Sequence, residues 1–198
     1  MFDHNKHIGL FFGSFNPVHV GHLALANYIA ENSDIDEVWF VVSPQNPFKN
    51  TSELVDAKHR VNMLEDSIGS YPKFKVCDIE LKLSTPSYTY KTLNELTFLH
   101  PNFHFSIIMG SDNLINLNRW KNIDEIMRLC TIKIYPRPEY PIAEELLTDT
   151  ISIIDAPVFN ISSTLIRKGL SEDKDYSYLI PKKAHDYIKN HGLYKFHH

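Results

Sequence analysis

The chain has 198 residues, 43% hydrophobic and 22% charged, a composition that fits one globular domain and excludes a disordered chain. Lys and Arg number 20 and Asp and Glu 24, so the net charge of -4 provides no overall basic surface for a nucleic-acid backbone. No apolar stretch approaches the about 20 residues of a membrane span, and the first residues lack a signal-peptide pattern. We therefore expect a cytoplasmic protein that binds neither nucleic acid nor membranes.

Short apolar runs alternate along the chain with segments whose apolar residues recur every three or four positions, which is typical of alternating strands and helices. In chain order we expect strand Ile8–Phe12, helix His19–Ala30, strand Glu37–Val42, helix Ala57–Ile68, strand Lys73–Leu81, helix Thr89–Leu99, strand Phe103–Met109, helix Asp124–Cys130, strands Ile132–Tyr135 and Ile151–Ile154, and helices Ser163–Lys168 and Pro181–Asn190.

Parallel strands need crossover helices, so this alternation predicts an α/β fold: a Rossmann-like, doubly wound, mostly parallel sheet with helices on both faces. We expect a single domain over residues 1–198, with a C-terminal helical part over about 161–193. Ligands bind such sheets beyond the carboxyl ends of the strands, where the strand order reverses. The candidate strand ends are Gly13, Ser43, Gly110 and Tyr135.

The end of the first strand has the densest group of functional side chains. Gly13 and Ser14 follow the strand directly, and the free amides before a helix N-terminus favour a phosphate. His19 and His22 are three positions apart, so both imidazoles can donate to phosphate oxygens from one side. Alternatively, His19 only caps the helix and His22 packs beneath it; a metal site lacks a third ligand at plausible spacing. The loop has neither the glycine triplet of a dinucleotide fingerprint nor the Gly-Lys-Ser/Thr of a Walker loop.

Two segments resemble the signatures of nucleotidyltransferases that have an H-x-G-H motif. They are FGSFNPVHVGH, residues 12–22, and ISSTLIR, residues 161–167. Ser162 and Ser163 can cap a helix whose N-terminus faces a phosphate, and Arg167 lies one turn further along. Alone, the second segment would be an ordinary capped helix with a surface arginine. The resemblance implies that ATP is bound by Gly13, Ser14, Phe15, His19, His22, Ile161, Ser162, Ser163, Thr164 and Arg167.

The middle of the chain resembles the nicotinate-nucleotide adenylyltransferases, and this resemblance covers essentially the full length. It rests on SPQNPFKN (43–50), TPSYTYKTL (85–93), GSDNLINLNRW (110–120) and YPRPEY (135–140). The resemblance implies that the pyridine nucleotide is bound by Asn16, Lys49, Thr85, Tyr88, Gly110, Asp112, Trp120 and Arg137.

Each of these middle segments also has an ordinary structural interpretation. Lys49 alone would be a solvated lysine, and residues 85–93 a helix start capped by Ser87 or Thr89. Asp112 alone would be a helix cap and Trp120 a core residue. Two positions depart from the family pattern, because Asn16 and Lys91 occupy places where the family often has aspartate.

The resemblance implies adenylyl transfer from ATP to nicotinate mononucleotide, in which the protein aligns two anions and stabilises the charge on the transferred group. The expected catalytic residues are His19, His22, Lys49 and Arg167. Mg²⁺ would arrive with ATP, held mostly by phosphates and water, so we expect no protein metal site. The alternatives are a related enzyme such as phosphopantetheine adenylyltransferase and a nucleotide-binding regulator without chemistry; the sequence leaves homo-oligomer formation open.

Overall fold

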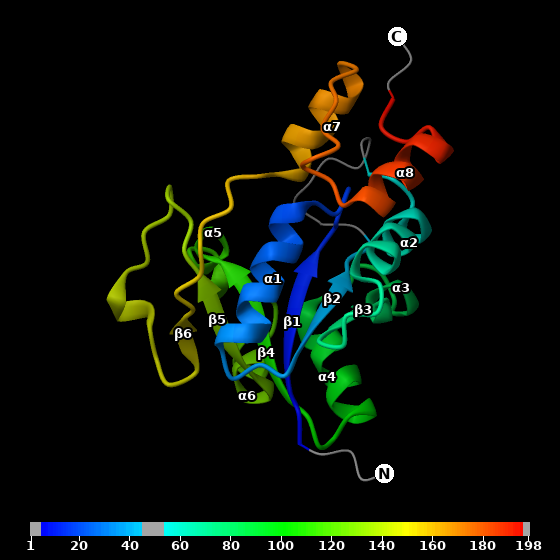
Figure 1. Cartoon of the computed structure of the whole chain (residues 1–198). Coiled ribbons are helices and arrows are strands. Elements are labelled where there is room, and N and C mark those ends of the chain that lie inside the picture. Colours follow the sequence, from blue (N-terminus) through cyan, green and yellow to red (C-terminus); the bar gives the residue numbers. More distant parts are fainter. Residues whose placement is uncertain (1–4, 45–53, 196–198) are drawn as a thin grey trace.

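The computed structural model describes residues 5–44 and 54–195, which form one six-stranded sheet covered by helices on both faces (Figure 1). All neighbouring strands pair in parallel, in the order β3-β2-β1-β4-β5-β6. The strands are β1 (His7–Gly13), β2 (Glu37–Val42), β3 (Phe74–Cys77), β4 (His104–Gly110), β5 (Cys130–Tyr135) and β6 (Ile151–Ile153). The predicted doubly wound α/β fold is confirmed, and the sheet is wholly rather than mostly parallel.

The helices divide between two hydrophobic clusters, one on each face of the sheet. They are α1 (Val20–Asn32), α2 (Ala57–Ile68), α3 (Ile79–Lys82), α4 (Thr89–Leu99), α5 (Ser111–Leu114), α6 (Ile123–Leu129), α7 (Ser163–Ser171) and α8 (Lys182–His191), with 3₁₀ turns η2 (Leu117–Arg119) and η3 (Glu144–Leu146). One cluster contains side chains of α1, α2, α7 and α8, and the other side chains of α3, α4, α5 and α6. The central strands are buried on both sides, which is why they are almost continuously apolar.

The strand order reverses beside β1, and this reversal positions the site. From β1 the chain winds outward through β2 and β3, then crosses to the other side of β1 and continues through β4, β5 and β6. β1 and β4 are therefore neighbours although about 90 residues separate them, and their carboxyl ends at Gly13 and Gly110 lie at the same edge. In open α/β sheets this switch point is where ligands bind.

One predicted strand is wrong in its second half. The segment Lys73–Leu81 forms β3 only from Phe74 to Cys77, after which Ile79–Lys82 form the helical turn α3. β3 pairs only with β2, and that pairing ends at Val41 with Cys77. After Cys77 the backbone groups of this segment have no strand partner, so they form the helical turn α3 instead. Ile79 and Glu80 are buried in this turn.

The predicted end of α7 is also corrected. Gly169 lies inside this helix, which continues to Ser171. A Cβ at Gly169 would overlap the Tyr176 ring, so this glycine allows a close approach and does not end the helix. By contrast, Gly69 and Gly192 follow α2 and α8 with φ of 56° and 61°, as expected of residues that end helices.

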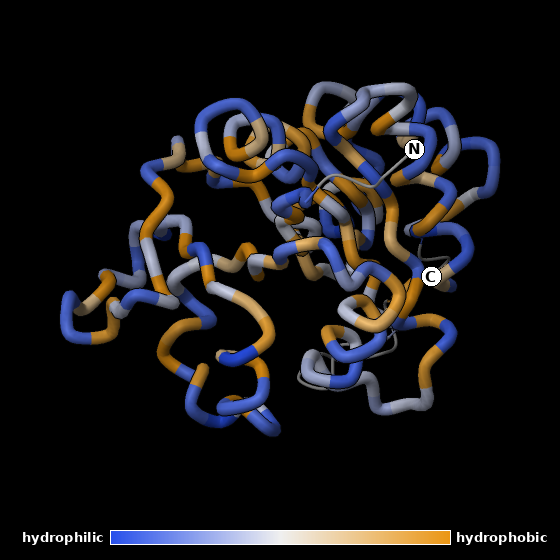
Figure 2. Tube along the Cα trace, turned by 90° about the horizontal axis from the view of Figure 1, so that it is seen from below, coloured by the Kyte–Doolittle hydropathy of each residue, from blue (hydrophilic) through white to orange (hydrophobic). Residues whose placement is uncertain are grey.

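Apolar and polar residues alternate at short intervals along the described part of the trace (Figure 2). Over the described ranges, none of the helices combines the length and the hydropathy that crossing a bilayer requires. Most of the buried apolar side chains instead belong to the two clusters described above.

Candidate active site

The loop after β1 is built around a buried phenylalanine. β1 ends at Gly13, and Phe15 then has a left-handed backbone with φ of 45° while its side chain is only 1% exposed. This conformation costs a residue with a Cβ about 1–3 kcal/mol, so the surrounding packing must impose it. The Phe15 ring packs edge-on against Phe11, Phe40 and His22. A Cβ at Gly13 would lie 2.8 Å from the Phe15 ring, which explains the glycine.

His19 and His22 cap the N-terminus of α1 by reciprocal hydrogen bonds. The His22 N–H donates to His19 Nδ1 and the His19 N–H donates to His22 Nδ1, each over 3.3 Å. A ring nitrogen that accepts an N–H carries no proton, so each ring holds its proton on Nε2. The two rings stack with centroids 3.6 Å apart. The capping role and a ligand-binding role are therefore compatible, because one nitrogen of each ring caps the helix and the other remains a donor.

The His19 ring is uncharged near neutral pH. Its side chain is almost completely buried, and this burial, with the nearby charge of Arg137 as a second cause, lowers the pKa of His19 from 6.5 to about 4. His19 is thus a fixed, neutral hydrogen-bond donor and not a source of charge.

The second signature is joined directly to the first loop. Ser162 caps α7 by accepting a backbone N–H of the first turn over 3.1 Å, as predicted. Ser163 Oγ donates to the carbonyl of Pro17 over 2.9 Å, and Arg167 Nη1 donates to the carbonyl of Asn16 over 2.9 Å. Residues 13–22 and 161–167 thus form one unit, which we call the motif cradle.

Asn16 connects the cradle to the C-terminal segment. Its Oδ1 accepts from the Tyr194 hydroxyl over 2.9 Å and from the Val55 N–H over 3.2 Å, and its side chain is buried. Burial raises the pKa of Tyr194, which keeps the hydroxyl protonated as a donor. An uncharged amide oxygen satisfies both donors, so the departure of Asn16 from aspartate is accommodated by the surrounding bonds.

Arg60, which the sequence analysis missed, lies fully buried beneath the cradle. Its guanidinium donates to four backbone carbonyls: Ser14 and Ser43 over 2.7 and 2.8 Å, Val55 over 2.9 Å and Pro44 over 3.1 Å. These bonds tie the loop after β1 to the loop after β2. The sequence contained a signal, because Arg60 lies three and four positions before the buried Met63 and Leu64 and so shares their side of α2.

An ion pair stands at the ends of β4 and β5. Asp112 Oδ1 lies 3.2 Å from Arg137 Nε, and the Arg137 N–H donates to Ser111 Oγ over 2.9 Å. Arg137 also bonds the Tyr135 hydroxyl over 3.2 Å. A Cβ at Gly110 would overlap Asp112 Oδ1 and lie 2.7 Å from Arg137 Nε, so the glycine makes room for the pair. Asp112 therefore does not cap α5, whose N-cap is Gly110.

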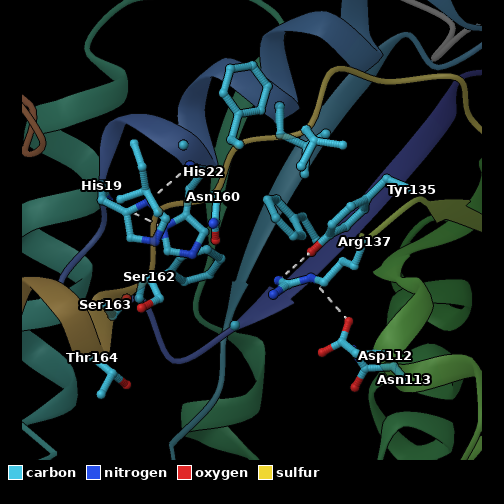
Figure 3. Close-up of a pocket in the computed structure, with 18 of the residues that line it drawn as sticks. His19, His22, Asp112, Asn113, Tyr135, Arg137, Asn160, Ser162, Ser163 and Thr164 are labelled. Atoms are coloured by element: carbon cyan, nitrogen blue, oxygen red, sulfur yellow. Dashed lines mark hydrogen bonds and ion pairs between the residues drawn. The ribbon is translucent and has the colours of Figure 1, made fainter. Parts of the chain in front are cut away.

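The motif cradle and the Asp112–Arg137 pair face one cavity of about 800 Å³ (Figure 3). The lining contains many of the residues that the sequence predicted for the site: Gly13, Ser14, Phe15, Asn16, His19, His22, Asp112, Arg137, Ile161, Ser162, Ser163, Thr164 and Arg167. The cavity also has lining residues that the sequence analysis did not name, among them Asn113, Asn160 and Tyr140. Asn113 and Asn160 directly follow or precede predicted site residues, which was the available signal.

The chain is similar to proteins of one family over most of its length. The cytidylyltransferase-like family model matches residues 10–169. Two proteins named probable nicotinate-nucleotide adenylyltransferase are each 45% identical to it: that of Bacteroides thetaiotaomicron, over 92% of this chain and 91% of the relative, and that of Flavobacterium johnsoniae, over 95% and 98%. The chain belongs to the nicotinate-nucleotide adenylyltransferase family.

A solved structure supports the same grouping. The nicotinic acid mononucleotide adenylyltransferase of Plasmodium falciparum complexed with NaAD is 26% identical, with a TM-score of 0.81 over 98% of this chain and 99% of that one. The complex of the same enzyme with APC gives a TM-score of 0.80. The predicted family resemblance is thus confirmed.

Four residues that the sequence predicted to bind the pyridine nucleotide lie outside the lining of the cavity: Thr85, Tyr88, Gly110 and Trp120. Trp120 packs at the margin of the hydrophobic cluster beneath α4 and α6. Tyr88 precedes α4 without a side-chain capping bond, and neither Ser87 nor Thr89 caps this helix. The Tyr88 ring lies 4.6 Å from Lys121 Nζ, so the segments around 88 and 120 are neighbours. Lys49, predicted to be catalytic, lies outside the described residues.

The described residues of this family member contain no group of three or more His, Cys, Asp or Glu side chains placed to hold a metal ion. Two described carboxylate residues line the cavity, Asp112 and Glu139, and Asp112 pairs with Arg137. Donor groups of the cradle are imidazoles, hydroxyls and a guanidinium, which suit phosphate oxygens rather than a cation.

Proposed function

We propose that the chain transfers the adenylyl group of ATP to nicotinate mononucleotide, giving nicotinate adenine dinucleotide and pyrophosphate in NAD biosynthesis. Family membership supports the reaction class. The observation that carries the proposal for this chain is that both signatures, 139 residues apart at their nearest ends, meet around one cavity. This cavity lies at the reversal of the strand order, where α/β sheets bind ligands.

The reaction needs no enzyme nucleophile. The 5′-phosphate of the mononucleotide is ionised near neutral pH and attacks the α-phosphorus of ATP, while the bond to the β-phosphate oxygen breaks and pyrophosphate leaves. The protein's task is to hold two anions in line and to stabilise the charge on the transferred group. The preformed hydrogen bonds of the cradle suit this task, because they fix donors before the substrates bind.

We assign the triphosphate to the cradle. His19 and His22 would donate from Nε2, since Nδ1 of each ring accepts a backbone N–H. The N-terminus of α7 and the Arg167 guanidinium would bind further phosphate oxygens, with Ser14 and the first turn of α1 on the other side. Lys49 would complete the cationic set.

We assign the pyridine nucleotide to the opposite side of the cavity. Asp112 is suited to accept from ribose hydroxyls, and Arg137 to bind a phosphate or carboxylate. Trp120 would stack on the nicotinate ring, with Thr85, Tyr88 and Gly110 nearby, and Asn16 would contact this nucleotide from the cradle. Mg²⁺ would be bound by the triphosphate and water, and would supply charge neutralisation to the leaving pyrophosphate.

A substrate panel tests the proposal. Nicotinate mononucleotide, nicotinamide mononucleotide and phosphopantetheine are each incubated with ATP and Mg²⁺, and pyrophosphate release is measured. We expect the highest kcat/KM with nicotinate mononucleotide. A preference for phosphopantetheine would assign the chain to the related reaction, and ATP binding in calorimetry with no pyrophosphate from any acceptor would make it a regulator; either result contradicts the proposal.

A further inference from the structure

Two lysines converge on one tyrosine ring beside the segments that we assign to the pyridine nucleotide. Lys121 Nζ lies 4.6 Å from the centroid of the Tyr88 ring, and Lys91 Nζ lies 5.8 Å from the same centroid. Lys91 Nζ also donates to Ser84 Oγ over 3.3 Å. We call the side chains of Ser84, Tyr88, Lys91, Trp120 and Lys121 the pyridine edge.

Local structure does not explain the position of Lys91. It lies in the first turn of α4, whose N-terminal end already has a partial positive charge, so a cation there is unfavourable by up to about 1 kcal/mol. Tyr88, the residue that precedes this helix, offers its ring face but no negative charge. The pyridine edge thus concentrates positive charge where the helix alone would favour an anion.

Three carboxylates near the pyridine edge, Asp78, Glu80 and Glu125, are bonded to other groups. Glu80 is buried and accepts from the hydroxyls of Thr92 and Ser87, and burial raises its pKa. Asp78 pairs with Lys82, and Glu125 accepts from two asparagine side chains. In residues 54–195, neither Lys91 nor Lys121 forms an ion pair with a carboxylate.

We propose that Lys91 and Lys121 select an acceptor nucleotide whose aromatic ring bears a carboxylate over one whose ring bears an uncharged carboxamide. Trp120 directly precedes Lys121, and both ammonium groups lie over the Tyr88 ring; the proposal places the substituent of a ring stacked on the Trp120 indole beside them. The inference rests on the proposed function, because it needs the pyridine nucleotide to bind at the pyridine edge. It assigns a role to Lys91 that the family pattern, with aspartate there, does not supply.

The expected effect is moderate, because Lys121 is exposed and Lys91 half-buried, and water screens charges at such positions. Each lysine should contribute about threefold to the preference for the ring carboxylate, and both together about tenfold. Ring stacking and phosphate binding are common to both acceptors, so they do not enter the ratio.

The experiment compares kcat/KM for nicotinate and nicotinamide mononucleotide, with ATP saturating, in Lys91→Met, Lys121→Met and the double variant. The ratio of the two constants should fall about tenfold in the double variant, with the KM for ATP unchanged. Lys91→Asp should lower the ratio further than Lys91→Met does, whereas Lys91→Arg should keep the ratio near that of the wild type. Lys183→Met, an exposed lysine of α8, is the matched control and should leave the ratio unchanged.

Ionic strength provides a second readout that a structural role would not affect. The wild-type ratio should decrease as salt is raised, whereas that of the double variant should stay constant. An active wild-type enzyme whose ratio is unchanged by both substitutions would overturn this inference alone. A wild-type enzyme that uses neither pyridine nucleotide would overturn the proposed function, and this inference with it.

Discussion

The motif cradle, which lines the cavity, and the pyridine edge, whose residues lie outside that lining, are built differently. The motif cradle is held by hydrogen bonds between segments far apart in sequence, such as the 2.9 Å bond from Arg167 to the carbonyl of Asn16, and its central side chains are buried. The pyridine edge is held by ring contacts and by the local bond between Lys91 and Ser84, and Lys121 is exposed. Buried, cross-linked groups are preorganised for charge stabilisation, whereas exposed groups can vary with the acceptor at little cost to the fold.

The largest effect should follow from removing Arg60. Arg60→Met leaves four backbone carbonyls without their donor, and at about 1 kcal/mol each we expect the free energy of unfolding to fall by about 4 kcal/mol. Urea denaturation measures this change. Lys58→Met, an exposed lysine on the same helix, should change it by less than about 0.5 kcal/mol. Equal effects of the two substitutions would show that the cradle does not depend on Arg60.

Acid should weaken the cradle through His19. The pKa of His19 is about 4 in the folded chain and near the ordinary histidine value of 6.5 in the unfolded chain, so the unfolded chain takes up a proton first as the pH falls. The stabilisation is complete above pH 6.5 and is lost between pH 6.5 and 4, by up to about 3 kcal/mol. Urea denaturation at each pH in this range gives the free energy of unfolding. This free energy should depend less on pH in His19→Asn, because asparagine keeps a capping side chain but does not titrate. The same pH dependence in both proteins would contradict the burial of a neutral His19.

Loss of one cradle donor should lower turnover strongly. His22→Ala should reduce kcat about a hundredfold or more, because one preorganised donor to the transferred group is lost. His22→Gln separates this role from capping, since glutamine at this helix position can still accept the His19 N–H. We expect thermal unfolding of the glutamine variant near that of the wild type and a low kcat. Full turnover in His22→Ala would exclude the histidine from the reaction.

The pyridine edge should give the smallest and most selective effect. Trp120→Ala should raise the KM for nicotinate mononucleotide about five- to tenfold, the loss expected of one aromatic stacking contact. The KM for ATP should not change, and Trp120→Phe should recover most of the loss. Steady-state kinetics with each substrate varied in turn measures both constants. Equal increases in the two KM values would indicate that Trp120 supports the fold and does not contact the ring.

Local sequence patterns predicted most of the fold and the cradle. The apolar runs located five of the six strands closely. Four of these are central parallel strands, which are buried on both faces and therefore read as continuous apolar runs. The prediction for β3, Lys73–Leu81, was four residues too long at its carboxyl end, because the apolar pattern of this segment does not reveal where its pairing with β2 stops. The cradle residues were predicted because each signature is continuous in sequence.

Long-range contacts could not be predicted in this way. Arg60 and Tyr194 act on the cradle from α2 and from the C-terminal segment, and nothing in their own neighbourhoods indicates a bond to Ser14 or Asn16. The location of Thr85 and Tyr88 outside the cavity lining depends on how α4 packs beneath the sheet. Such contacts follow from tertiary packing, which depends on many residues distant in sequence and is not visible in any one local pattern.

The bond between Tyr194 and Asn16 spans 178 positions, nearly the entire chain. During synthesis the amino-terminal strand leaves the ribosome first, but the first signature loop cannot acquire its final set of bonds until residue 194 has emerged. A nascent chain with the sheet already formed would therefore hold an incomplete phosphate loop. The timing of translation thus ties the final set of bonds in this loop to the emergence of residue 194.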